Sequence, residues 1–152
     1  MYLAGPLFTS AERSWNVWLA AKLRQKGFVV VLPQEEPIQT IKEAYIDYGI
    51  IFPVCLSQIR SCSAVIGILD RPHPDSGTAF ECGHAYALEK PIIRIRTDLR
   101  AGGEEGGVNT MLKRSCSQFV AVVSVGSADK LVEGIVQALE SASSGDLTMT
   151  QQ

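Results

Sequence analysis

The chain has 152 residues, of which 46% are hydrophobic and 20% charged, and its formal net charge is −2. These values are typical of one soluble globular domain that is long enough to bury a substantial core. Because the chain has no basic block and no run of 18 apolar residues, we expect neither a nucleic-acid polymer nor a membrane as partner. No targeting segment precedes the first strand pattern, so we expect a cytoplasmic protein.

Five short apolar runs alternate with segments of helical spacing. The run at 28–32, FVVVL, carries three consecutive valines, which favours a strand buried on both faces of a parallel sheet. Alternating strands and helices favour right-handed βαβ units. We therefore predict an α/β fold, a flavodoxin-like three-layer sandwich with a five-stranded, mainly parallel sheet in the order 2-1-3-4-5. The predicted strands cover residues 1–5, 28–32, 64–69, 91–95 and 118–123.

Local signals set the predicted helix ends. Ser10 is a candidate N-cap with Glu12 in the first turn, although Arg13 excludes a full capping box, and Gly27 can end this helix. Pro53 is expected to interrupt the second helix. Loops are expected at 33–41 and 98–108, and a domain at 1–140 is expected to precede a flexible polar tail at 141–152. The predicted helices cover residues 10–26, 42–61, 78–88, 109–114 and 128–139.

The cysteines form no CxxC pair and none pairs with histidine at zinc spacing. We expect free, mostly buried thiols, with no metal site and no cofactor. Neither of the common glycine-rich phosphate-binding motifs is present. The four cysteines are Cys55, Cys62, Cys82 and Cys116.

The most informative stretch is 69–84, LDRPHPDSGTAFECGH, which follows the apolar run 64–69. In the predicted fold, ligands bind at the carboxyl ends of the strands, where the loops after Gly5 and Leu69 come together. The carboxylates of Asp70, Asp75 and Glu81 can therefore point into one crevice.

Each of these acidic residues also has a purely structural interpretation. Thr78 and Glu81 match a capping box, in which Glu81 would only bond the backbone amide of the N-cap. Asp75 could cap the same helix, and Asp70 could be a solvated loop carboxylate. Their clustering leaves the functional and the structural interpretations about even.

Taken together, these segments resemble the nucleoside 2-deoxyribosyltransferase family. The opening YLAGPLF at 2–8, with AER at 11–13, is similar to the family's first strand and loop. The stretch 75–85, DSGTAFECGHA, is similar to the family signature Asp-x-Gly-x-x-x-Glu-x-Gly-x-Ala. Residues 109–111, NTM, are similar to its Asn-x-Met element. The likeness runs from Tyr2 to about Val123.

The resemblance implies an enzyme that moves a 2-deoxyribosyl group between nucleobases with retention at C1′. Glu81 would attack C1′ and form a covalent ester, which a second base then attacks. Tyr2 would orient this nucleophile, Asp75 would contact the sugar hydroxyls or the base edge, and a place in the first helical turn would favour ionised Glu81. Further substrate contacts are implied for Gly5, Pro6, Phe8, Asp70, Gly77, Asn109 and Met111.

The implied partners are a 2′-deoxynucleoside and a free nucleobase, as in nucleoside salvage. Asn109 and Met111 would reach the 5′ end of the nucleoside in a neighbouring subunit's site. The resemblance therefore implies a homo-oligomer, typically a hexamer built from dimers.

One position departs from the family, which usually carries an Asp near the base, 26 residues before the nucleophile; here that position holds Cys55. A thiol with an ordinary pKa near 8.5 is a poor substitute for a carboxylic acid. Losing a general acid typically lowers the rate by about 10² to 10⁴. Asp47 or Asp70 could compensate if the loop geometry differs.

Two other functions stay open. A 2′-deoxynucleoside 5′-monophosphate N-glycosidase would use the same glutamate and give the sugar to water. Asp75 opposes it, because a carboxylate about 4 Å from a phosphate costs about 4 kcal/mol per unit charge at an effective dielectric of 20, whereas Arg13 could bind a phosphate. A non-enzymatic nucleoside-binding module is favoured by Cys55 and opposed by intact Tyr2 and Glu81.

Overall fold

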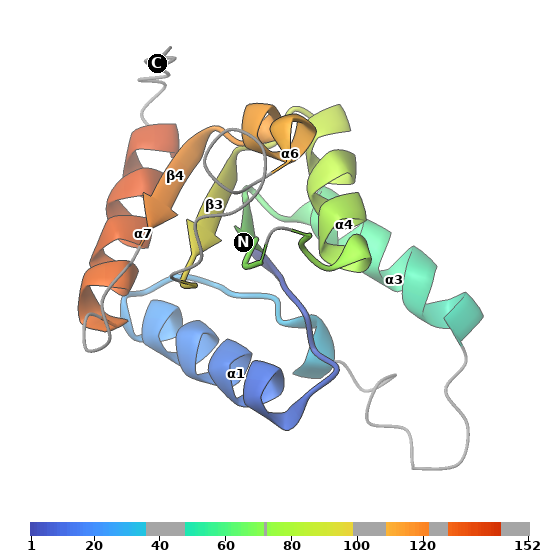
Figure 1. Ribbon diagram of the computed structural model, residues 1–152, viewed down its shortest axis with the longest axis horizontal. Helices are drawn as coiled ribbons and strands as arrows, with labels where there is room; N and C mark the ends of the chain where they lie inside the picture. The colour runs from blue at the N-terminus through green and yellow to red at the C-terminus, as the bar shows by residue number, and fades with distance from the viewer. Residues whose placement is uncertain (36–47, 72, 99–108, 122–127, 144–152) are drawn as a thin grey trace.

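The computed structural model describes residues 1–35, 48–71, 73–98, 109–121 and 128–143 (Figure 1). A parallel sheet lies at its centre, with four strands in the spatial order β1-β2-β3-β4. This confirms an α/β fold built on a parallel sheet. The strands are β1 (Tyr2–Ala4), β2 (Val65–Ile68), β3 (Ile92–Arg96) and β4 (Gln118–Ala121). The helices are α1 (Ser10–Gln25), the 3-10 helix η1 (Pro33–Glu35), α3 (Tyr48–Ser61), α4 (Ser76–Ala87), α6 (Thr110–Ser115) and α7 (Ala128–Ser143).

The prediction of five strands is wrong, because residues 28–32 form only an isolated parallel bridge between Val31 and Tyr2. Two backbone hydrogen bonds make this bridge, from Leu3 N to Val31 O at 3.0 Å and from Val31 N to Met1 O at 2.9 Å. Val29 is 81% exposed, so the run is not buried on both faces. Pro33 follows at once and has no N–H to continue a ladder. The bridge lies on the free side of β1, where the order 2-1-3-4-5 places its second strand.

Two predicted helix features are wrong at the N-terminal half of the chain. Thr9, not Ser10, caps α1, and it forms a full capping box with Glu12. Thr9 N donates to Glu12 Oε2 at 2.8 Å, and Glu12 N donates to Thr9 Oγ1 at 3.2 Å. Helix α3 continues through Pro53, although the missing N–H of this proline leaves out one backbone hydrogen bond of the helix. The predicted end of α1 at Gly27 is confirmed, with φ of +90° at this residue.

Two later helices also extend beyond their predicted bounds. Helix α4 begins at Ser76 rather than Thr78. Helix α7 continues to Ser143, past the predicted helix end at 139 and past the expected domain boundary at 140. Most of the predicted loops at 33–41 and 98–108, and the rest of the expected tail, lie outside the described residues.

The two faces of the sheet bury separate apolar clusters, because successive side chains of a strand point to opposite faces. Leu3 faces α1 and α7, whereas its neighbour Tyr2 faces α3 and α4. Figure 1 shows these two helix pairs on different sides of the sheet. The alternation in β1 therefore delivers Tyr2 to the layer that contains α4.

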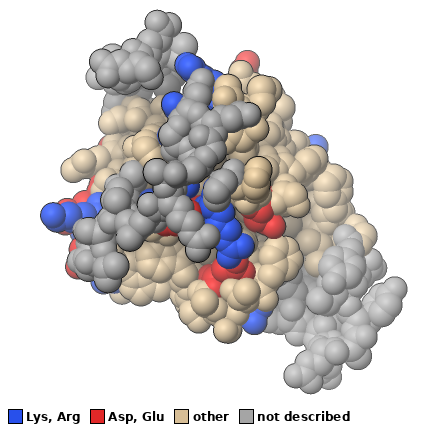
Figure 2. Space-filling view, in the orientation of Figure 1, with Lys and Arg blue, Asp and Glu red and all other residues tan. Residues whose placement is uncertain are grey.

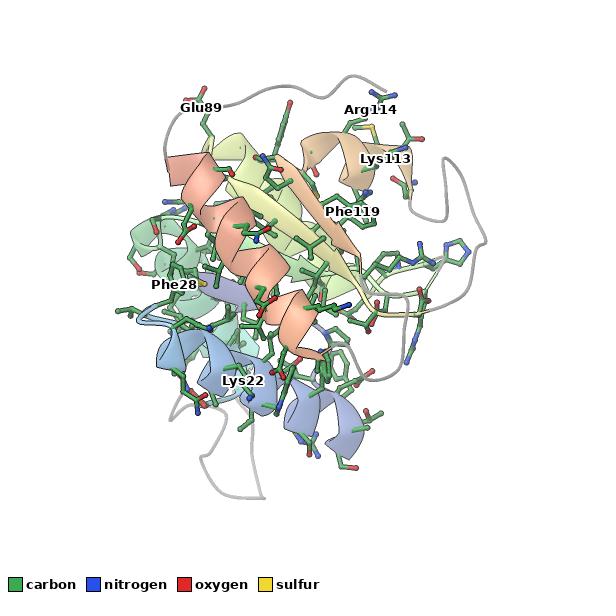
Figure 3. The ribbon with its side chains drawn as sticks, turned by 90° about the vertical axis from the view of Figure 1, so that its left-hand side faces the viewer. Lys22, Phe28, Glu89, Lys113, Arg114 and Phe119 are labelled. Carbon is green, nitrogen blue, oxygen red and sulfur yellow. The ribbon has the colours of Figure 1, made fainter. Side chains whose placement is uncertain are left out.

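The aromatic ring of Phe119 on the outer strand β4 packs against the buried side chain of Arg94 on β3. Arg94 pairs in register with Phe119, and its guanidinium carbon lies 3.9 Å from the centre of the aromatic ring. Figure 3 shows Phe119 on this strand and the basic residues Lys113 and Arg114 on α6. Stacking on an aromatic face is a favourable environment for a guanidinium group.

The four cysteines are free thiols, which confirms their predicted state; two are buried and two half-buried. No group of three or more potential metal ligands occurs among the residues that the structure describes. Within the same residues, no helix combines the length and the apolar character needed to cross a membrane.

Candidate active site

The centre of the candidate site is a hydrogen bond between β1 and α4. The Tyr2 hydroxyl donates to Glu81 Oε1, although the two residues lie 79 positions apart. They meet because β1 pairs with β2 and α4, which follows β2 in the chain, packs across both strands. Tyr2 is fully buried and Glu81 is half-buried, so the carboxyl group faces the protein on one side and the surface on the other.

The surroundings of this pair set its protonation. Burial raises the pKa of Glu81 to about 7, the hydrogen bond from Tyr2 lowers it, and the charge of Asp75 raises it. Ionised and protonated Glu81 are therefore comparably populated near neutral pH. Burial and the charge of Glu81 raise the pKa of Tyr2 far above its ordinary value, so its phenol keeps its proton.

The expectation that a helix start would keep Glu81 ionised is wrong. Helix α4 begins at Ser76, and its first turn holds no acidic residue. Glu81 lies in the second turn, beyond the part of the helix where the dipole acts strongly. The effect of burial on its pKa outweighs any contribution from the helix.

The capping-box interpretation of Glu81 is also wrong, because Asp75 caps α4. Asp75 Oδ2 accepts from Thr78 N at 2.8 Å and from Thr78 Oγ1 at 3.1 Å. Thr78 is therefore the third residue of the helix, and the side chain of Glu81 is left to face Tyr2. A Cβ at Gly77 would lie 3.1 Å from Asp75 Oδ2, which explains the glycine beside this cap.

Cys55, where the family usually carries Asp, lies at the same tyrosine. It is half-buried on α3, which packs against α4, and it is one of the groups that raise the pKa of Tyr2. We did not count Cys55 among the predicted site residues. Its spacing from Glu81 was the signal that could have placed it there.

The loop after β1 is fixed close to the sheet. A Cβ at Gly5 would lie 2.7 Å from Ile68 Cδ1, so any larger residue there would force the side chain of Ile68 to shift. The Pro6 carbonyl accepts from Nδ2 of Asn16 at 2.9 Å. Asn16 is a buried polar residue on α1 that sequence reasoning missed. Phe8 is 73% exposed and lies on the outer part of this loop.

Asp70 fastens the end of β2 to the end of β3. Its Oδ1 accepts from Thr97 N at 2.6 Å and Asp98 N at 3.2 Å, and its Oδ2 accepts from Thr97 Oγ1 at 2.6 Å. Asp98 in turn accepts from Arg71 N at 2.7 Å and from Arg96 Nε at 2.6 Å. Arg71 has φ of +72°, a left-handed conformation that these contacts hold. The interpretation of Asp70 as a solvated loop carboxylate is therefore wrong.

The charges at the rim of the site are mixed. Nη2 of Arg71 lies 3.5 Å from Glu12 Oε1, the carboxylate that caps α1. Figure 2 shows Lys and Arg side chains next to Asp and Glu side chains on the described part of this face. Neither sign dominates there, which fits a ligand without a large net charge.

The structure places the last two predicted residues on α6. Asn109 caps this helix by accepting from Met111 N at 3.0 Å, and Met111 is 77% exposed. Helix α6 packs against α4, but neither residue hydrogen-bonds Tyr2 or Glu81 in the described part of the chain. Tyr2, Glu81, Asp75 and Cys55 thus form the compact centre of the site.

Comparisons with known proteins relate the chain to one family and one fold. The model of the family described as nucleoside 2-deoxyribosyltransferase matches residues 1–130. A conserved protein from Enterococcus faecalis V583 is 27% identical with a TM-score of 0.73, over 90% of this chain and 96% of its own. A 2-deoxyribosyltransferase from Leishmania mexicana is also 27% identical, with a TM-score of 0.61 over 87% and 95% of the two chains.

A third solved structure shares the fold. This 2-deoxyribosyltransferase from Bacillus psychrosaccharolyticus is 24% identical, with a TM-score of 0.65 over 86% of this chain and 93% of its own. No curated protein sequence matches this chain.

Proposed function

The chain belongs to the nucleoside 2-deoxyribosyltransferase family, and from this premise we propose that it transfers the 2-deoxyribosyl group of a 2′-deoxynucleoside from one nucleobase to another. The observation that carries the proposal is the hydrogen bond from Tyr2 to Glu81. It fixes a half-buried carboxyl group whose pKa of about 7 lets it act as a nucleophile at neutral pH.

The two carboxyl oxygens of Glu81 take different roles. Oε1 accepts the hydrogen bond of the Tyr2 hydroxyl, which leaves Oε2 to attack C1′. In the first step, the Oε2–C1′ bond forms, and the C1′–N bond breaks with its electron pair going to the base. In the second step, a nitrogen of the incoming base attacks C1′ and releases the carboxylate. Two inversions give retention, as in retaining glycosidases.

The departing base lacks one source of protons. A thiol at position 55 is a weaker acid than the family's carboxyl group, so we expect bases that leave without strong protonation to react fastest. Asp75 supplies a negative charge near Glu81 and a contact for the sugar or the base edge. In this proposal, the nucleoside binds between the loop after β1 and the loop after β2. The residues that contact it there are Gly5, Pro6, Phe8, Asp70 and Gly77.

We also propose that the site is completed by a second subunit. Asn109 and Met111 are exposed, and in the described part of the chain neither hydrogen-bonds the Tyr2–Glu81 pair. The exposed rings of Phe52 on α3 and Phe80 on α4 lie 5.8 Å apart and add apolar surface beside α4. A homo-oligomer joined through this surface would bring Asn109 and Met111 to a neighbouring site.

Hydrolysis of a 5′-monophosphate is the rival function. Arg13, the candidate phosphate ligand, donates through Nη1 to Leu7 O at 3.1 Å and Phe8 O at 3.2 Å. This guanidinium group therefore braces the loop, and Asp75 adds negative charge near the nucleophile. Both observations favour an uncharged 5′-hydroxyl.

The experiment is an exchange assay with deoxyinosine, with and without excess adenine, in which chromatography separates the products. Deoxyadenosine that appears with the wild type but not with Glu81→Gln supports transfer. Glu89→Gln is the matched control, because it removes an exposed carboxylate just beyond the other end of α4. Free hypoxanthine without exchange, or turnover of deoxynucleoside monophosphates alone, would point to the hydrolase. No turnover of either would favour a binding module.

A further inference from the structure

We propose that Arg71 is a positioning residue for nucleoside binding: it connects the loop after β2 to the loop after β1, and so fixes the distance between the two walls that hold the nucleoside. The proposal rests on the proposed function, because it concerns the binding step of that reaction. Two contacts carry it, one from the backbone of Arg71 and one from its side chain.

The backbone of Arg71 has a conformation that glycine adopts more readily. Its φ is +72°, in the left-handed region, where the Cβ of any other residue is strained. Arg71 N donates to Asp98 Oδ2 at 2.7 Å, and Asp98 Oδ1 accepts from Arg96 Nε at 2.6 Å. The end of β3 therefore fixes the direction in which the side chain of Arg71 leaves the end of β2.

This strain has no explanation in a helix end. Glu89 also has a positive φ, of +55°, but it comes directly after the C-cap of α4, where a left-handed residue commonly ends a helix. Arg71 instead follows the carboxyl end of a strand, the edge of the sheet at which this type of fold binds its ligands. A strained residue that its neighbours hold at such a place is a candidate for a functional role.

The side chain of Arg71 reaches the other wall of the site. Its Nη2 donates to Glu12 Oε1 at 3.5 Å, although the two residues lie 59 positions apart. The second oxygen, Glu12 Oε2, accepts from Phe8 N at 3.1 Å and from Thr9 N at 2.8 Å. One carboxylate thus joins the guanidinium group of Arg71 to the backbone of the loop that carries Phe8, one of the proposed substrate contacts.

The exposure of the two side chains decides what this ion pair can do. The side chain of Glu12 is 17% exposed, whereas that of Arg71 is 70% exposed. An ion pair with one solvated partner contributes little to the stability of the whole protein and is weakened by salt. The pairing of β1 with β2 already holds the two strands together. We therefore expect the ion pair to affect the relative position of the two loops rather than the fold.

The test compares Arg71→Gly, Arg71→Lys, Glu12→Gln and the double variant of Arg71→Gly with Glu12→Gln. Arg71→Gly removes the side chain and keeps the backbone conformation without strain. Glu12→Gln removes the charge and keeps the capping box, which accepts glutamine. Lys22→Gln is the matched control, because Lys22 forms a similar ion pair, 3.6 Å from Asp129, at the other end of α1 (Figure 3).

Three quantities are measured for each protein. The first is the pair of constants KM and kcat for transfer from deoxyinosine to adenine, at low and at high salt. The second is the rate of hydrogen exchange at the backbone amides of Phe8 and Thr9, which requires no reaction. The third is thermal unfolding, which shows that each variant is folded.

We expect the KM for deoxyinosine to rise about 2- to 5-fold in Arg71→Gly and in Glu12→Gln, with kcat nearly unchanged. The double variant should show no larger rise than either single one, because both remove the same ion pair. Arg71→Lys restores a positive charge and should recover part of the loss. The amides of Phe8 and Thr9 should exchange about 2- to 5-fold faster in Arg71→Gly, while its unfolding temperature stays within about 3 °C of the wild type.

Salt distinguishes an ion pair from a general effect of the substitution. Between about 0.01 M and about 1 M salt the Debye length falls from about 30 Å to about 3 Å. The KM of the wild type and of Lys22→Gln should rise over this range towards the value of Arg71→Gly. The KM of Arg71→Gly itself should change less, because the variant has no ion pair to lose.

A wild-type KM in folded Arg71→Gly would overturn the proposal, and so would a fall in kcat at unchanged KM. Additive effects in the double variant, or a KM rise of the same size in Lys22→Gln, would also overturn it. If the wild type shows no transfer but the amides of Phe8 and Thr9 exchange faster in Arg71→Gly, the connection between the two loops stands and the proposed reaction fails.

Discussion

Replacing Tyr2 with phenylalanine removes one oxygen and keeps the buried ring. The hydroxyl donates to Glu81, and this bond lowers the pKa of Glu81, which burial and the charge of Asp75 raise, to the net value of about 7. A hydrogen bond to a charged group is worth about 1.5–3 kcal/mol, so its loss should raise the pKa of Glu81 by about 1–2 units. Only the ionised carboxylate attacks C1′, so transfer at pH 7 should fall about 5- to 50-fold.

Because the pKa of Glu81 should rise in Tyr2→Phe, the loss of activity should depend on pH. Activity of Tyr2→Phe should recover as the pH rises past the new pKa, so the ratio of wild-type to variant rates should shrink between pH 7 and pH 9. The measurement is the rate of base exchange at fixed substrate from pH 5 to pH 10, with thermal unfolding at each pH to show that the variant stays folded. A loss of equal size at every pH would refute the reasoning, because it would mean that Tyr2 acts otherwise than through the ionisation of Glu81.

Three further predictions concern the frame of the site. Glu81 has a folded pKa of about 7 against 4.5 ordinarily, so the stability it contributes below pH 4.5 is lost as the pH rises through 7. The free energy of unfolding of Glu81→Gln relative to the wild type should therefore rise by about 2–3 kcal/mol between pH 4 and pH 8, as measured by urea denaturation. The same pH dependence of stability in both proteins would contradict this. Asp75→Asn keeps a good N-cap but removes the charge that raises the pKa of Glu81. The acidic limb of the pH–rate profile of transfer should therefore move to lower pH, and a move to higher pH would exclude this effect of Asp75. In Gly5→Ala, the new Cβ would lie 2.7 Å from Ile68 Cδ1, and the free energy of unfolding should fall by about 1–3 kcal/mol. The double variant Gly5→Ala with Ile68→Val lacks that methyl group, so thermal unfolding should show that it regains part of the lost stability.

Sequence patterns select candidate site residues, but they do not predict the contacts between them. Asp75, Glu81 and Tyr2 could be selected because apolar runs and family motifs mark where strands end and helices begin. The hydrogen bond between Tyr2 and Glu81 joins positions 79 residues apart, and no local pattern carries that information.

Helix starts were mispredicted where several residues could cap. Thr9 and Ser10 are adjacent hydroxyl residues, and the side chain of Glu12 decides between them by reaching back to Thr9 N. Before α4, both Asp75 and Thr78 could cap, and the bond of Glu81 to Tyr2 removes the partner that a cap at Thr78 needs. Tertiary contacts thus decide between local alternatives that are close in energy.

The run 28–32 shows the limit of β propensity. Its valines favour a strand, yet Val31 alone forms a bridge to the sheet. Propensity reflects how well a side chain fits a half-buried pleated surface, and Val29 instead points to solvent. Pro33 follows this run and has no N–H with which to extend the strand pairing.

The carboxylate of Asp70 has a consequence for how this site can diversify. By accepting from the backbone of Thr97 and Asp98, it occupies the amides that would lie unpaired where the two strands diverge. Asp98 holds the backbone of Arg71 on one side, and Asp75 starts α4 through its own cap on the other. Because both ends are closed independently, we expect that the length and sequence of the segment between Arg71 and Asp75 can vary without loosening the sheet or shifting Glu81. The rim of the site could thus change in length and sequence while the reactive centre is inherited unchanged.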